Sequence, residues 1–301
     1  MEIKNLITFI NVVELGSFTK AAEVLGYSQP TISFQIKQLE DELGCLLFER
    51  INHTITLTER GHELLTYAHK IQSMTDEFEE NFGQEQSLSG NIHIITPDSL
   101  CTDMIHLNYI DFHQKHPEIS LKFTTADTTV MMEMIDHNEA DLMITLDRRI
   151  YQKDYVIAKE EGLPMHFVAS SSSKFANKKN LHIKDIVEEP FVLTEYGQGY
   201  RRVLDRELEK RSLEIRPVLE IGRTDLITSV LTQSNMISFL PDFVTEAKIK
   251  SGELCYLDIC DVNLEIYKQL IYHKNKWMSS SFKALIEYIK ENEFKGDSLS
   301  S

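Results

Sequence analysis

Two glycines, Gly16 and Gly26, limit what the N-terminal end of this chain can fold into. Each follows a short stretch with apolar residues at helical spacing, and glycine is typical of a helix C-terminus because it readily adopts a left-handed backbone conformation. A third helix is predicted to follow, with Ser28 as its N-cap and Pro30 in its first turn, where a missing N–H is tolerated. Three short helices joined by corners this tight predict a helix-turn-helix arrangement.

The apolar faces of these helices are expected to form one small core. Thr19 is the predicted cap of the second helix. The third helix lies in the segment YSQPTISFQIKQLEDELG and has one apolar stripe. That stripe consists of Ile32, Ile36, Leu39 and Leu43. Phe34 lies about 200° around the helix from Ile32, so it is expected to face away from the core.

The following two segments predict a wing and a long helix. CLLFERINHTITLTERG alternates like two short strands around Asn52 and His53. Next, HELLTYAHKIQSMTDEFEENF has one apolar stripe between polar flanks. Its members are Leu64, Ala68, Ile71, Thr75, Phe78 and Phe82. The stripe either packs on its own domain or forms a dimer seam, and its place between domains favours the dimer seam.

Strands and helices alternate from Gly90 onward. The order strand–helix–strand–helix–strand up to about residue 147 predicts a parallel sheet with right-handed crossovers. A second set of strands and helices begins at MHFVASSS, and the last amphipathic helix is SSFKALIEYIKEN. This count of elements predicts two α/β lobes with a cleft between them.

Charge and cysteine content narrow the possible functions. The net charge of −16 argues against a general polyanion binder, so DNA binding would depend on locally placed groups. The four cysteines, at positions 45, 101, 255 and 260, lack CxxC or metal-type spacing and are expected to be reduced thiols. No apolar run is long enough to span a membrane and no signal peptide is evident, so the cytoplasm is the expected location.

The ordered N-terminal residues resemble those of LysR-type transcriptional regulators. The matching sets are G-S-F-T-x-A-A-x-x-L, S-Q-P-x-[IV]-S-x-x-I-x-x-L-E-x-x-L-G, L-F-x-R and L-T-x-x-G. The segment SFLPDFVTEAKIKSGEL resembles the family's L-P-x-x-[FV] segment. The resemblance implies an α+β multidomain protein: a winged helix-turn-helix, a long linker helix and a two-lobed α/β effector domain of the periplasmic-binding-protein type. It also implies a homodimer or homotetramer that binds a small molecule between the lobes and needs no cofactor.

These parts are expected at defined positions. The predicted boundaries are 1–60 for the DNA-binding domain, 61–88 for the linker and dimerisation helix, and 91–301 for the effector domain. Within the effector domain, lobe 1 is expected at about 91–161 and 267–301, and lobe 2 at about 162–266.

The outward face of the third helix is the predicted DNA-reading surface. Gln29 is suited to an adenine edge, Thr31 and Ser33 to phosphates, and Lys37 to phosphate or guanine. Phe34 departs from the family, which often has arginine there, and it either contacts thymine methyl groups or packs on the wing or a partner helix. The full set is Ser28, Gln29, Pro30, Thr31, Ser33, Phe34, Lys37 and Gln38, with Arg50 and His53 from the wing. The alternative for each polar residue is simple solvation.

Helix N-termini at the strand ends are the predicted effector site, because free N–H groups and the helix dipole converge there. The residues are Ser99, Leu100, Cys101, Thr102, Thr128, Thr129, Gln198, Gly199 and Thr224. The alternative is that these hydroxyls only cap their own helices. Asp98 and Glu195 lie beside these segments and would repel a multiply charged anion, so they favour a ligand that bears an amine, or water in part of the cleft.

Other chemistries have little support in the sequence. His106, His113 and His116 lack the spacing of a metal-binding helix, so no metal site is expected. Cys101 lies near a helix start, where a thiolate is favoured, and a thiol-based redox switch on the same scaffold is therefore the alternative function. No nucleophile–base pair is visible, so an enzyme is not expected.

Overall fold

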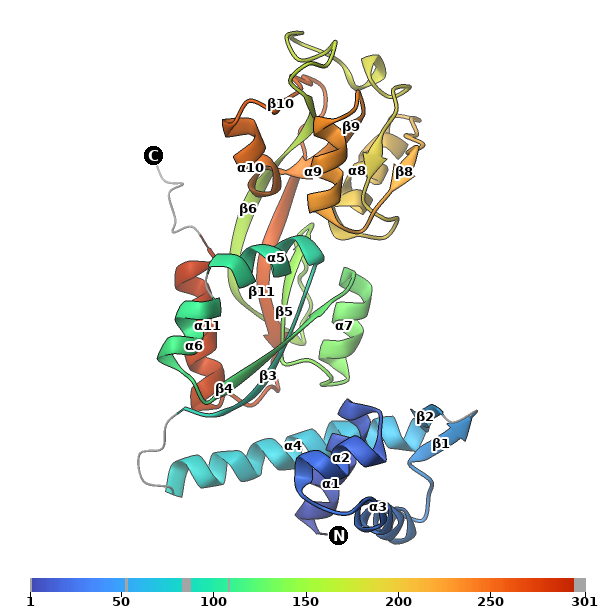
Figure 1. Cartoon of the computed structure of the whole chain (residues 1–301), viewed down its shortest axis with the longest axis vertical. Coiled ribbons are helices and arrows are strands. Elements are labelled where there is room, and N and C mark those ends of the chain that lie inside the picture. Colours follow the sequence, from blue (N-terminus) through green and yellow to red (C-terminus); the bar gives the residue numbers. More distant parts are fainter. Residues whose placement is uncertain (1, 52–53, 83–87, 108, 295–301) are drawn as a thin grey trace. The chain divides into compact units, whose positions relative to one another are not determined.

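The computed structural model describes the fold of residues 2–51, 54–82, 88–107 and 109–294. The chain divides into two compact units. The first contains α1 to α4 with strands β1 and β2, and the second contains the elements from β3 to α11 (Figure 1). No helix among the described residues is long and apolar enough to cross a membrane.

The first unit is a winged helix-turn-helix. Its elements are α1 (Ile3–Leu15), α2 (Phe18–Leu25), α3 (Gln29–Leu43), β1 (Phe48–Ile51), β2 (Thr54–Leu57) and α4 (Glu59–Phe82). Gly16 and Gly26 follow α1 and α2 in the left-handed conformation, with φ of 58° and 68°, which confirms both predicted corners. Ser28 caps α3 as predicted. The cap of α2 is Ser17, whose side chain accepts from the Lys20 N–H, so the prediction of Thr19 is wrong.

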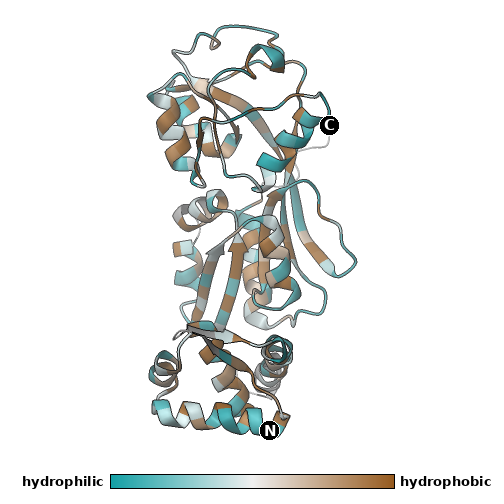
Figure 2. Cartoon of the chain, turned by 90° about the vertical axis from the view of Figure 1, so that its right-hand side faces the viewer, coloured by the Kyte–Doolittle hydropathy of each residue, from teal (hydrophilic) through white to brown (hydrophobic). Residues whose placement is uncertain are grey.

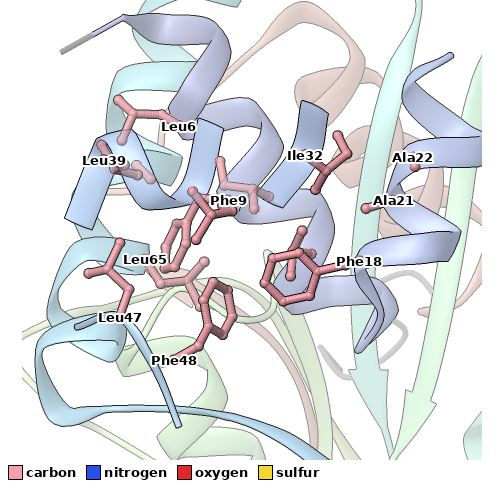
Figure 3. Packing of buried hydrophobic residues seen from close by; sticks show 14 residues of the cluster. Leu6, Phe9, Phe18, Ala21, Ala22, Ile32, Leu39, Leu47, Phe48 and Leu65 are labelled. Atoms are coloured by element: carbon pink, nitrogen blue, oxygen red, sulfur yellow. The ribbon is translucent and has the colours of Figure 1, made fainter. Parts of the chain in front are cut away.

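A compact aromatic and aliphatic core holds this unit together (Figure 3). Phe48 of β1 packs against Phe9 and Phe18, with ring centroids 5.3 and 5.6 Å apart. Ile32, Ile36 and Leu39 of α3 are buried as predicted. Leu43 is 42% exposed, so its place in the stripe is wrong.

The predicted dimer stripe on α4 is partly used inside its own unit. Ala68 is buried in the core, and Leu64 and Ile71 pack against it. The side chains of Phe78 and Phe82 lie outside those that the structure describes. At these three positions the stripe therefore contributes to the core of the first unit.

The second unit is a sheet with a change of partners along one long strand. The strands β3, β4 and β5 pair in parallel, as the alternating order predicts, and β11 pairs antiparallel with β5 and β6. Up to Pro164, β6 pairs with β11, and from Met165 it pairs with β9 and β10. This change divides the unit into a first and a second lobe, both crossed by β6 (Figure 1).

The two lobes contain the following elements. The first lobe has β3 (Gly90–Thr96), α5 (Asp98–Leu107), α6 (Tyr109–Lys115), β4 (Ile119–Thr125), α7 (Thr128–Asp136), β5 (Leu142–Asp147), the start of β6 (Tyr155–Ser170), β11 (Glu265–His273) and α11 (Ser280–Asn292). The second lobe has the rest of β6, η1 (Ile183–Asp185), β7 (Val192–Leu193), α8 (Gly199–Glu209), β8 (Leu219–Glu220), α9 (Thr224–Thr232), β9 (Ile237–Pro241), α10 (Asp242–Lys250) and β10 (Leu254–Tyr256). Apolar residues concentrate on the central strands (Figure 2), and every residue of β5 is buried.

Candidate functional site

The outward face of α3 is polar except for one aromatic side chain. Phe34 is 67% exposed, although Ile32 and Ile36 of the same helix are buried. Pro30 and Lys37 are exposed, and Gln38 is half-buried beside Glu42, to which its amide donates at 3.4 Å. Phe34 therefore faces away from the core, as the helical spacing predicts.

The first turn of α3 presents hydroxyls and an amide that bond to one another. Ser28 Oγ accepts from the Thr31 N–H at 3.3 Å and lies 2.8 Å from Thr31 Oγ1. Gln29 Nε2 donates to Ser33 Oγ at 2.8 Å. The structure thus brings these four predicted residues together at one helix end. Their bonds are local and exposed, so they can be exchanged for bonds to phosphates or base edges at small cost.

The wing is fixed to α3 by a carboxylate that the sequence analysis did not single out. Glu40 Oε1 accepts from the Leu47 N–H at 2.8 Å and from the Phe48 N–H at 3.4 Å. Arg50 lies on β1, where its backbone pairs with Ile55, but its side chain is outside those described. His53 also lies outside the described residues.

A second buried polar contact joins α1 to α3. Thr8 Oγ1 donates to Gln35 Oε1 at 2.8 Å, and both residues are buried. Because an unpaired buried amide is unfavourable, this bond favours one angle between the two helices. The exposed face of α3 is therefore held in a defined direction.

Between the two lobes, an aspartate at the end of β5 collects three donors. Asp147 Oδ2 accepts from Thr128 Oγ1 at 2.8 Å and forms an ion pair with Arg202 of α8. Asp147 Oδ1 accepts from the Arg148 N–H at 2.8 Å. Arg202 also donates to Thr129 Oγ1 at 3.3 Å. Thr128 and Thr129 thus meet as predicted, but around a protein carboxylate.

The helix that carries Arg202 lies directly against β5. A Cβ atom on Gly199, the first residue of α8, would be 2.0 Å from the Leu146 carbonyl oxygen and 3.1 Å from Asp147 Oδ2. Only glycine permits this approach. The N-terminus of α8 in the second lobe therefore touches the first lobe.

The lobes also meet where α5 contacts α9. Burial raises the pKa of Asp98 at the start of α5, and the nearby Arg223 partly offsets that rise. Arg223 itself pairs with Asp225, with Nη2 2.7 Å from Oδ2. Burial also raises the pKa of Tyr200, whereas the nearby Thr194 and Ser99 hydroxyls act in the opposite direction. This side of the interlobe region thus holds both signs of charge.

The remaining predicted effector residues differ in burial and in hydrogen-bond partners. Ser99 Oγ is buried without a hydrogen-bond partner among the described residues. Leu100 and Thr224 are buried, and Gln198 is half-buried. Thr102 is exposed and donates to the Asp98 carbonyl of its own helix at 3.1 Å, which is the capping alternative.

Cys101 does not have the character of a reactive thiolate. Burial raises the pKa of its thiol, and the charge of Asp98 raises it further. The expectation that the start of α5 favours the thiolate is therefore wrong, because burial and the negative charge of Asp98 both favour the neutral thiol. All four cysteines are free thiols.

Three charged residues of the interlobe region were missed by the sequence analysis: Asp147, Arg202 and Arg223. Asp147 ends a wholly buried strand, and a carboxylate in that place is a signal that sequence reasoning can use. Arg202 is one of two successive arginines just after GQG. Nothing in the sequence, however, indicates that it reaches Asp147.

Family models match most of the chain. The model described as bacterial regulatory helix-turn-helix protein, lysR family, matches residues 3–62, and the model described as LysR substrate binding domain matches residues 85–293. The chain is 29% identical to the HTH-type transcriptional regulator YwqM of Bacillus subtilis. The alignment spans 292 residues and covers 97% of this chain and 99% of that protein. It is 28% identical to the HTH-type transcriptional activator CmpR of Synechocystis, over 93% of this chain and 92% of that protein.

Solved structures share the fold over nearly the whole length. Full-length OxyR from Pseudomonas aeruginosa matches with a TM-score of 0.76 at 17% identity, covering 97% of this chain and 95% of that one. Full-length CbnR in complex with its target DNA matches with a TM-score of 0.59 at 18% identity, covering 97% and 99%. At these identities the likeness concerns the fold.

Proposed function

The chain belongs to the LysR family of bacterial transcriptional regulators, and from this premise we propose that it reads an operator with the exposed face of α3 and responds to a small molecule bound between its lobes. As a family member it is a DNA-binding transcriptional regulator. We place it in the cytoplasm, where bacterial DNA lies, and assign it regulation rather than catalysis. The observation that carries the proposal is the exposed Phe34 on a helix whose opposite face is buried.

The DNA contacts divide by chemistry. Gln29 and Phe34 face base edges, and Lys37 binds a phosphate or a guanine. The hydroxyls of the first turn and the wing residues bind the backbone. The proposed set is Ser28, Gln29, Pro30, Thr31, Ser33, Phe34, Lys37 and Gln38, with Arg50 and His53. Because the chain has a net charge of −16, specific contacts on α3 contribute more than a general basic field.

Replacing Phe34 with alanine tests the groove-reading role. We expect operator affinity to fall roughly tenfold, because one base contact contributes on the order of 1–3 kcal/mol. Affinity for random DNA should change by less than about twofold, since thymine methyl contacts carry sequence information and phosphate contacts do not. Fluorescence anisotropy at one fixed salt concentration measures both.

The matched control is Val218→Ala, which removes another largely exposed apolar side chain far along the chain. It should leave both affinities unchanged. An equal loss on operator and random DNA in Phe34→Ala would assign Phe34 to packing against the wing or a partner helix instead.

We propose the interlobe region as the effector site, formed by the predicted residues together with Arg202 and Arg223. The predicted set is Ser99, Leu100, Cys101, Thr102, Thr128, Thr129, Gln198, Gly199 and Thr224. The buried hydroxyl of Ser99 lies near the Tyr200 hydroxyl, so we assign both hydroxyls to the site. An anionic group that replaces Asp147 on Arg202 breaks the ion pair between α8 and β5, so binding of such a group is coupled to the contact between lobes.

A second copy of the chain completes the proposed regulator. Tyr67 and Met74 of α4 are 56% and 67% exposed, on a helix whose Leu65 and Ala68 are buried. We propose that this exposed face of α4 contributes to a homodimer, which pairs two DNA-binding units across spaced half-sites. A homotetramer of two such dimers is the other arrangement proposed.

The redox alternative leads to a separate expectation. Because the pKa of Cys101 lies above its ordinary value, its thiol should react with iodoacetamide at pH 7 more slowly than a free cysteine does. Mass spectrometry of peptides after timed alkylation measures this rate. Peroxide should change operator binding equally little in the unmodified chain and in Cys101→Ser. A peroxide response that disappears in Cys101→Ser would establish the redox switch.

A further inference from the structure

Three metal-binding side chains meet on the surface of the second lobe: His182, Cys260 and Asp261. Their ligand atoms all lie within 4.8 Å of one another. His182 Nδ1 is 3.5 Å from Asp261 Oδ2 and 3.9 Å from Cys260 Sγ. Ligand atoms of a tetrahedral Zn²⁺ site lie about 3.3–3.8 Å apart, because the metal–ligand bonds are about 2.0–2.3 Å long. The three side chains thus need only small rotations to share one ion.

The backbone holds the two segments that carry these side chains together. The Leu181 N–H donates to the Asp258 carbonyl at 2.9 Å, and the Cys260 N–H donates to the Leu181 carbonyl at 2.8 Å. The Ile183 N–H donates to Asp261 Oδ1 at 2.9 Å, which orients the carboxylate and leaves Oδ2 toward His182. Ordered ligands lose little conformational entropy when an ion binds.

Arg211 lies beside the cluster, and its positive charge competes with a metal ion for Asp261. Its Nη1 lies 3.3 Å from Asp261 Oδ2, but its Nε and Nη2 also donate to Glu207 Oε1 at 3.1 and 3.0 Å, and Nη2 donates to the Asp261 carbonyl. The guanidinium therefore keeps its other partners when Oδ2 turns to a metal.

We propose that His182, Cys260 and Asp261 bind a divalent ion of the Zn²⁺ class, with water as the fourth ligand. One thiolate, one imidazole and one carboxylate are donors that Zn²⁺ accepts, whereas Ca²⁺ and Mg²⁺ prefer oxygen ligands alone. Cys260 binds as the thiolate, and its proton passes to solvent. The site shares no residue with the proposed DNA-reading face or the proposed effector site, and it joins the segment before η1 to the segment before β11.

Titration of the full chain with Co²⁺, a coloured substitute for Zn²⁺, tests the site. We expect thiolate-to-cobalt charge-transfer absorption in the near ultraviolet and visible bands of four-coordinate Co²⁺, both removed by added Zn²⁺. Competition with a chromophoric chelator then measures the Zn²⁺ affinity. Since loss of an outer-shell partner alone weakens a site about 10–100-fold, Cys260→Ser and His182→Ala should each weaken Zn²⁺ binding by at least about tenfold.

The matched control is Cys255→Ser, which removes another free cysteine and should leave the spectrum unchanged. His182 and Cys260 are exposed, so their variants are expected to stay folded, and circular dichroism checks this. Saturating Co²⁺ without thiolate absorption, or absorption that persists in folded Cys260→Ser, would overturn the proposal.

Discussion

Replacing Phe9 with alanine is expected to unfold the DNA-binding unit and abolish operator binding. Phe9 has no exposed surface and packs against Phe48 with a centroid distance of 5.3 Å (Figure 3). Truncating a buried phenylalanine typically costs about 3–5 kcal/mol, because apolar contacts are lost and a cavity remains. A small domain has only about 5–15 kcal/mol of stability, and one of this size has little to spare.

Hydrogen exchange of the full chain, read by mass spectrometry, gives the measurement. Peptides from residues 3–62 should lose protection, whereas peptides from the C-terminal domain should keep it. Phe34→Ala is the control, because it removes the same side chain from an exposed position of the same unit. Unchanged protection in Phe9→Ala would show that the rings around Phe48 do not hold the helices and the wing together.

The predictable part of the fold depends on local chemistry. Gly16, Gly26 and Ser28 act within one helical turn, so their effect can be read from neighbouring residues, and all three have the predicted roles. The cap of α2 is two residues earlier than predicted, at Ser17 instead of Thr19. Both residues can accept a backbone N–H, and the apolar spacing of α2 does not specify its first residue.

On α3 and α4, helical periodicity predicts the direction of a side chain but not the residue that it contacts. Leu43 has the period of the buried stripe, yet it lies in the last turn beside Gly44, where the chain turns away from the core. Gln35 is buried because Thr8 of α1 supplies a partner, which a single helix does not reveal. Ala68 likewise faces a core that only the folded domain provides.

The candidate sites show the same limit more strongly. Sequence reasoning found the helix starts around the interlobe region, because each follows a strand. It missed the ion pair of Arg202 with Asp147, and it missed the cluster of His182 with Cys260, because the residues of each group are far apart in the chain. Tertiary packing brings such residues together, and the spacing of neighbouring residues in the sequence does not reveal these contacts.

Adding one methyl group at Gly199 is expected to separate the two lobes where α8 meets β5. The new Cβ would lie 2.0 Å from the Leu146 carbonyl oxygen, which belongs to a buried central strand and has no room to move. The start of α8 must shift instead, and Arg202 shifts with it away from Asp147. Overpacking of this kind costs about 1–3 kcal/mol. For a domain of this size that corresponds to a lower melting temperature, by about 2–4 °C per kcal/mol.

The matched control is Gly162→Ala, because a Cβ there meets only the Tyr267 ring at an ordinary 3.5 Å. Hydrogen exchange should show lost protection in peptides that cover the start of α8 and the end of β5 in Gly199→Ala, and none in Gly162→Ala. Since the proposed regulator responds to a molecule bound between its lobes, a change at the lobe contact should also change the ligand-free footprint on the operator in Gly199→Ala. Lost protection at α8 with an unaltered footprint would separate lobe closure from DNA placement, and would place the coupling between effector and operator elsewhere in the chain.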